Sequence, residues 1–252
     1  MIIPSSYNNL TIEQFQKLTV LVTKDQSIER DILILSLLTG KSSFDIEKLS
    51  PTVFYQYFAM TSFIHEPIKS IGLKKSTWLG FKKFKAITEI HDFTTAQHKD
   101  FTEIMKANDN NYIACLPNIL AICHKELTLK GYVYNSDNHY KNAKIFRQAK
   151  IKDVLGAVFF LFQMFEKLQH DYRKLIGITY ENDKGDVRGD RKRQAISGFF
   201  EHWGWEYSVS LTVIDSGLSE DEIYKWNVLR FHNKLSYLKD KGKFEISLNG
   251  NK

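Results

Sequence analysis

The side chains best suited to chemistry in this sequence are two cysteines with an adjacent histidine and one glutamate–histidine pair. Cys115, Cys123 and His124 carry groups that bind zinc. A zinc site normally needs four ligands in closely spaced pairs, and Cys115 and Cys123 do not form such a pair. Their apolar surroundings indicate buried free thiols rather than a disulfide framework. Glu166 and His170 stand four residues apart, the spacing of an ordinary ion pair on a helix surface. We therefore expect neither a metal site nor a catalytic acid–base pair.

The chain carries none of the short motifs that mark common enzyme classes. It has no Gly-x-Ser-x-Gly elbow, Walker-type phosphate loop, dinucleotide-binding glycine pattern or His-Glu-x-x-His sequence. We therefore expect that the protein is not an enzyme and that it uses no cofactor.

Two basic stretches carry the residues that we predict to face a partner or DNA. In residues 74–85 lysines are interleaved with aromatic side chains, and residues 181–193 read as an exposed, charged loop with two glycines. The candidate residues are Lys82, Lys83, Lys85, Arg188, Arg191, Lys192 and Arg193. Such groups can contact a phosphate backbone, but solvated loops and salt bridges to an acidic neighbour have the same composition. The net charge of +6, spread over 35 basic and 29 acidic residues, does not decide between these readings.

Residues 151–176 predict one long helix at the centre of the fold. Apolar side chains recur there every three or four positions, Asp153 stands in the first turn, and Gly177 follows as a stop signal. The apolar run is too short for a membrane span, which needs roughly 20 residues. The fold class that we predict is mainly α, a helical bundle with minor short β elements built around this helix.

Residues 1–65 predict a compact N-terminal module of four helices with short loops. The end signals, in chain order, are the Thr11–Gln14 capping box that opens a helix to about Val22, Gly40 after a second helix, Ser42 before a third, and Ser50-Pro51 before a fourth over residues 52–64. We predict that residues 66–252 form a second helical domain, although the two parts could also be one continuous domain.

Minor β structure and a last helix are predicted in the remainder. Residues 84–90 allow one or two short strands, and residues 127–144 allow a short hairpin or a surface loop. A capping box at Ser219 and Glu222 predicts a last helix from Ile223 to Leu238, followed by a charged tail.

Two pairs of segments within the chain resemble each other. Residues 10–19 align with residues 93–102 without a gap. The positions of Gly40, Ser42, Ile46 and Phe54 are repeated, at one constant offset, by Gly217, Ser219, Ile223 and Phe231. Either a helical unit was duplicated, or the likeness is the general one between amphipathic helical hairpins.

Residues 3–6, 10–15, 29–40 and 46–49 resemble the start of small virion and tail-assembly proteins of tailed bacteriophages, especially crAss-like and other phages of Bacteroidetes. The resemblance covers the first 65 residues best and residues 199–238 more loosely. It is a pattern of helices and turns, and it brings no catalytic residue with it.

The resemblance implies a structural subunit of the virion, a ring or adaptor protein of the portal–tail connector that joins head to tail by oligomerisation. Its partners would be the portal protein, other connector or tail proteins, further copies in a homo-oligomeric ring, and packaged DNA by non-specific contact. It would be located in the portal–tail region of the virion, after assembly in the host cytoplasm, without a membrane. Two alternatives remain: a tail assembly chaperone, and a nucleic-acid-binding helical protein.

The first six residues have neither a basic start nor a long apolar run, which predicts no secretory signal.

Overall fold

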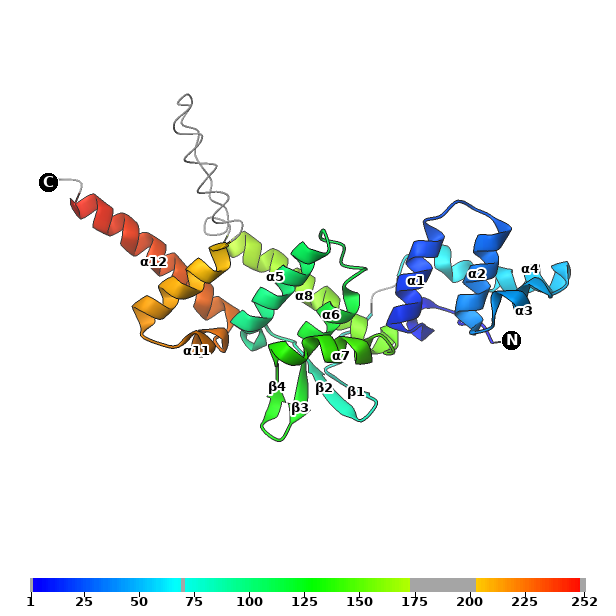
Figure 1. The fold of residues 1–252 in the computed structure, drawn as a ribbon, viewed down its shortest axis with the longest axis horizontal. Coiled ribbons are helices and arrows are strands. Elements are labelled where there is room, and N and C mark those ends of the chain that lie inside the picture. Colours follow the sequence, from blue (N-terminus) through cyan, green and yellow to red (C-terminus); the bar gives the residue numbers. More distant parts are fainter. Residues whose placement is uncertain (1, 69–70, 173–202, 250–252) are drawn as a thin grey trace, which may run out of the picture. The chain divides into compact units, whose positions relative to one another are not determined.

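The computed structural model describes residues 2–68, 71–172 and 203–249 (Figure 1). Within them the chain is mostly helical and has one small antiparallel sheet of four strands, so the predicted mixture of helix with minor β structure is confirmed. None of the described helices is both long enough and apolar enough to cross a membrane.

Contacts between residues divide the chain into two compact units. The first comprises Met1–Thr88 and Phe101–Leu161, and the second comprises Glu89–Asp100 and Phe162–Lys252. The predicted division after residue 65 stays a prediction, because grouping residues by contact does not test which parts fold independently.

The first unit begins with the predicted module of four helices. These are α1 (Ile12–Val22), α2 (Ile28–Thr39), α3 (Ser43–Glu47) and α4 (Pro51–Ala59). Both capping-box hydrogen bonds between Thr11 and Gln14 form at the start of α1, and Gly40 ends α2 in the left-handed conformation with a φ of 70°. The fourth helix is shorter than predicted, because a separate 3-10 turn over Ser62–His65 replaces its last turn.

The sheet consists of two hairpins paired side by side. Its strands are β1 (Ser76–Leu79), β2 (Lys82–Ala86), β3 (His124–Thr128) and β4 (Gly131–Val133), in that order. Each hairpin has a glycine with positive φ at its turn, Gly80 at 58° and Gly131 at 94°, where another residue would be strained. Figure 1 shows both hairpin loops at the same end of the sheet. Strands were predicted only from residue 84 onward, so β1 lies outside the predicted range.

The other helices are α5 (Thr95–Ala107), α6 (Leu116–Ile122), α7 (His139–Phe146), α8 (Ile151–Asp171), a helical segment over residues 203–216, α11 (Glu220–Tyr224) and α12 (Val228–Asn249), with short 3-10 turns at Tyr7–Asn9, Ile90–Asp92 and Ser136–Asn138. Helix α7 was not predicted, because its stretch was expected to be a hairpin or a loop. Helix α8 starts where predicted, whereas residues 173–176 and the charged loop at 181–193 lie outside the described residues. A central role for α8 is not confirmed, since α8 and α12 have similar lengths of 21 and 22 residues.

The predicted last helix is wrong in its bounds. The capping box at Ser219 forms, but it opens the short helix α11, which ends at Tyr224. The backbone then pairs with a distant segment instead of continuing as helix: Thr95 N–H donates to the Trp226 carbonyl at 2.8 Å, and Val228 N–H donates to the Phe93 carbonyl at 2.9 Å. Helix α12 starts afresh at Val228, and the expected charged tail is its C-terminal half.

The first internal likeness extends to local structure. Thr94 and Gln97 form the same reciprocal capping bonds as Thr11 and Gln14. Both threonines also pair with the residue before a long helix: Thr11 forms an antiparallel bridge with Lys150 before α8, and Thr94 forms one with Asn227 before α12.

The second internal likeness extends to the cores. Helices α3 and α11 begin and end at equivalent positions, α4 and α12 begin at equivalent positions, and Gly217 repeats the left-handed φ of Gly40 at 67°. The core of the first module contains Ile32, Ile46, Leu49, Phe54 and Phe58, and the equivalent core contains Val209, Ile223, Trp226, Phe231 and Leu235. Two modules of the same plan, α2–α3–α4 and 203–216–α11–α12, therefore lie in this chain.

Two helix glycines give a matched test of the packing around α8. A Cβ on Gly156 would lie 2.6 Å from the Gly72 carbonyl oxygen, whereas a Cβ on Gly242 in α12 would have no neighbour within 4 Å. We expect Gly156→Ala to lower the free energy of unfolding by about 1–3 kcal/mol through this clash. We expect Gly242→Ala to raise it by about 0.5–1 kcal/mol through backbone entropy. Urea unfolding measures both, and a Gly156→Ala protein as stable as the wild type would contradict the close approach.

Candidate functional site

The register of the sheet separates its side chains onto two faces. Phe84 lies opposite both Thr77 and Glu126, and these side chains point toward the helices, where the Phe84 ring lies 4.9 Å from that of Phe146 in α7. Alternation along each strand places the other residues on the opposite side. We call this second side the outer face: it comprises Ser76, Trp78, Lys83, Lys85, Lys125, Leu127 and Tyr132.

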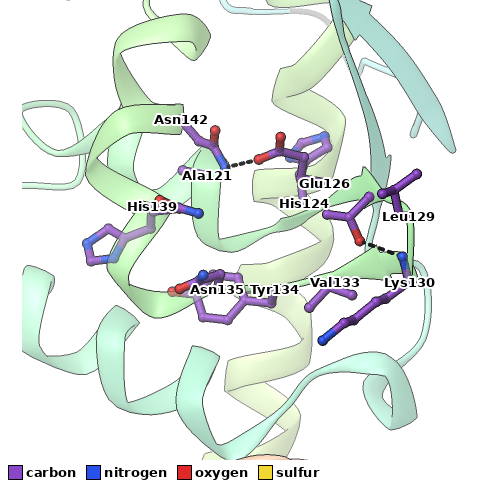
Figure 2. A pocket seen from close by; sticks show the side chains of 12 residues that line it. Ala121, His124, Glu126, Leu129, Lys130, Val133, Tyr134, Asn135, His139 and Asn142 are labelled. Atoms are coloured by element: carbon purple, nitrogen blue, oxygen red, sulfur yellow. Dashed lines mark hydrogen bonds between the residues drawn. The ribbon is translucent and has the colours of Figure 1, made fainter.

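A polar network ties the inner side of the sheet to α7. Lys82 Nζ lies 2.8 Å from Glu126 Oε1 and 3.2 Å from the Asn142 side-chain oxygen. The Asn142 amide donates to Glu126 Oε2 at 3.1 Å (Figure 2). Lys82 therefore joins the two hairpins to a helix, and its charge is already matched by a carboxylate.

A cavity of about 450 Å³ lies beside this network, between the β3–β4 hairpin and helices α6 and α7. Figure 2 shows Glu126 and Asn142 on one side of it and Tyr134 and Asn135 on another. His124 also lines the cavity, and its Nδ1 bonds to the Leu120 carbonyl at 2.7 Å. The Nδ1 atom must therefore carry the proton, which leaves Nε2 as an acceptor.

The electrostatics of His124 limit the chemistry of this cavity. Burial lowers the pKa of His124 to about 4, so the ring is neutral at physiological pH. Its Nε2 is buried and has no hydrogen-bond partner among the described residues. This nitrogen can therefore accept a hydrogen bond.

The residues considered for metal or acid–base chemistry lie apart. Cys115 and Cys123 are free buried thiols, and burial raises the pKa of both. In the described part of the chain no group of three or more His, Cys, Asp or Glu side chains is placed to hold a metal ion. On α8, His170 bonds to Asp171 at 3.2 Å, and no bond to Glu166 is formed.

A cluster of aromatic rings in the second unit contains two buried histidines. The ring centroids of His98 and His232 are 5.2 Å apart, and rings of Phe165 and Trp205 lie equally close to His98. Burial lowers the pKa of His98 to about 3, helped by the neighbouring His232, and burial lowers the pKa of His232 to about 4. Both rings are therefore neutral parts of an apolar core.

The predicted basic residues separate into three groups. Lys82 lies in the inner network, whereas Lys83 and Lys85 lie on the outer face. The remaining candidates, Arg188, Arg191, Lys192 and Arg193, lie outside the described residues. Sequence reasoning missed Lys125, which stands directly opposite Lys85 in the sheet. Residues 124–128, His-Lys-Glu-Leu-Thr, show no polar–apolar alternation that would indicate a strand, and nothing local gives its register.

We expect Lys82 and Lys83 to differ in their effect on stability although they are adjacent. Lys82→Met breaks a partly exposed ion pair and a hydrogen bond, and should lower the free energy of unfolding by about 0.5–1 kcal/mol. Lys83→Met breaks no ion pair among the described residues and should change it by less than about 0.5 kcal/mol. Urea unfolding of both variants measures the difference. Equal effects would contradict the separation of these lysines.

We expect acid to destabilise the fold through its buried histidines. The pKa values of His98, His124 and His232 in the folded chain lie below the value of about 6.5 for unfolded histidine. As the pH falls from about 6.5 to about 4, the unfolded chain binds protons that the folded chain does not, so stability is lost in this window. The loss at about pH 5 should be on the order of 1–2 kcal/mol per histidine.

Urea unfolding at several pH values tests this dependence. His232→Gln should reduce the loss of stability, while His170→Gln, which changes a ring that is 88% exposed, should leave it unaltered. A urea midpoint that stays constant between about pH 6.5 and pH 4 would contradict the expected loss of stability through the buried histidines.

Comparison with protein-family models, curated proteins and solved structures gave no match for this chain.

Proposed function

We propose that this chain is a structural subunit of a tailed-bacteriophage virion, a ring or adaptor protein that joins the portal to the tail. It assembles as a homo-oligomer, contacts the portal protein and other connector or tail proteins, and acts by binding rather than by catalysis. Its place is the portal–tail region of the particle, reached from the host cytoplasm. The long α8 would be the helix at the centre of each subunit.

The observation that carries the proposal is the exposed C-terminal end of α12. Asp215, in the helical segment over residues 203–216, forms ion pairs with Lys234 and Lys241 of α12. Beyond that point, every residue from 243 to 248 is exposed, and we call this segment the C-terminal arm. In Figure 1 the arm is the red end of the chain. A helix this exposed is marginal alone, because isolated short helices are barely stable in water.

The arm carries exposed apolar side chains on two sides, Phe244 and Leu248 on one and Ile246 on the other. Phe244 and Leu248 are 61% and 58% exposed. Tyr237, two helical turns before Phe244, lies on the same face of α12. Exposed apolar side chains at helical spacing are typical of a surface that packs against another protein. Such a contact would also supply the tertiary packing that the arm lacks.

A closed ring needs a second, different surface on each subunit, because neighbours contact head to tail. The N-terminal module offers candidates, since Phe44 of α3, Tyr55 of α4 and Met60 directly after α4 are each about three-fifths exposed. These residues lie on the segment that resembles phage assembly proteins. We infer that the arm of one subunit packs against the N-terminal module of the next.

Native mass spectrometry of the purified full chain over a range of concentrations tests this assembly. The wild type should form an oligomer of one defined size, and Phe244→Glu with Leu248→Glu should shift it to the monomer, because two charges would be buried in the contact. Ile246→Glu is the matched control, because it lies on the other side of the same helix and is also exposed. A wild-type chain that stays monomeric at the highest soluble concentration, or equal effects of both changes, would contradict the proposal.

A further inference from the structure

The outer face of the sheet combines positive charge with exposed rings. Of the described residues that the register places there, three are lysines, Lys83, Lys85 and Lys125, and none is acidic. Trp78, on the edge strand β1, is 64% exposed. Phe81, in the loop between β1 and β2, is also fully exposed. Two exposed rings next to the lysines give this face an apolar as well as a charged component.

The lysines are concentrated on neighbouring strands of the sheet. Lys85 and Lys125 are direct cross-strand partners on the same face. Positive charge is thereby gathered on this face. Neither Lys83 nor Lys85 forms an ion pair within the described residues, in contrast to Lys82, which bonds to Glu126. The face is therefore complementary to a polyanion.

The position of Trp78 narrows the choice among polyanions. Trp78 is the cross-strand partner of Lys83, whose Nζ lies 5.8 Å from the centre of the ring. An exposed ring bordered by lysines offers a surface for stacking a base while the ammonium groups contact the adjoining phosphates. A duplex keeps its bases stacked inside and would leave this ring unused, and an acidic peptide has no flat group to stack on it.

We propose that the outer face of the sheet binds single-stranded nucleic acid, with Trp78 stacking on a base and Lys83, Lys85 and Lys125 contacting phosphates. Figure 1 shows that the strands β1 to β4 extend away from α6 and α7 toward their loops. Binding is independent of base sequence, because these groups contact rings and phosphates rather than base edges. This activity is separate from ring assembly, since it uses none of the residues assigned to the C-terminal arm.

Fluorescence anisotropy of a labelled oligothymidine of about 20 nucleotides, titrated with the full chain, tests this site. Trp78→Ala should weaken binding about five- to hundredfold through lost stacking. Lys83→Ala with Lys85→Ala should weaken binding and also reduce the slope of log affinity against log salt by about 1.4, which corresponds to two lost phosphate contacts. Circular dichroism checks that the variants are folded.

The matched control removes the same charge from another surface. Lys24→Ala with Lys41→Ala changes two exposed lysines of the N-terminal module and should leave affinity and salt slope close to those of the wild type. Equal losses in both double variants would mean that only net charge matters, which overturns the proposal. Absence of binding at low salt would overturn it as well.

Two competitors distinguish the other polyanions. A duplex of the same length should bind more weakly than the single strand, and its binding should not change in Trp78→Ala. If the duplex binds as tightly as the single strand, or if a poly-glutamate peptide displaces the oligonucleotide at equal charge concentration, the face is a general anion surface and the assignment to single strands is wrong.

Discussion

The starts of the two long helices depend on one repeated interaction, in which an extended segment pairs with the residues just before each helix. The first N–H of α8, at Ile151, donates to the Leu10 carbonyl, and the first N–H of α12, at Val228, donates to the Phe93 carbonyl. These four residues are completely buried. A buried helix start leaves N–H groups without partners unless another segment supplies carbonyls, so both pairings are required by burial. Each pairing also fixes the start of a second helix, since Thr11 and Thr94 cap α1 and α5.

Local signals predicted the parts of the fold that local interactions determine. Three helix-end signals could be predicted from sequence because each forms hydrogen bonds within a few residues: the capping box at Thr11, the left-handed Gly40 and the cap at Ser42. The break between α11 and α12 could not be predicted from local sequence. It is caused by hydrogen bonds from Thr95 to Trp226 and from Val228 to Phe93, and each bond joins residues more than a hundred positions apart. The alignment of residues 10–19 with residues 93–102 indicated a second helix of the same kind, but it did not indicate that Thr94 pairs with Asn227.

The candidate site was predictable in composition but not in arrangement. The lysines of residues 82–85 could be named from sequence, yet alternation along β2 sends Lys82 to the inner network and leaves Lys83 on the outer face. Lys125 joins them only through pairing between strands separated by two helices, which single-sequence patterns do not specify. The sheet thereby converts one basic stretch into a structural lysine and a charged surface. Assembly through the C-terminal arm and binding at the outer face would use separate parts of the chain.

The central proposal is that this chain is part of a tailed-phage virion, and mass spectrometry of purified, DNase-treated particles of a phage that encodes it tests this proposal most directly. Copy number is measured against the portal protein. A subunit of the portal–tail ring should be present at the copy number of the portal or a small multiple of it. Absence from particles, together with abundance in the infected lysate, would contradict the ring assignment and identify the chain as a tail assembly chaperone.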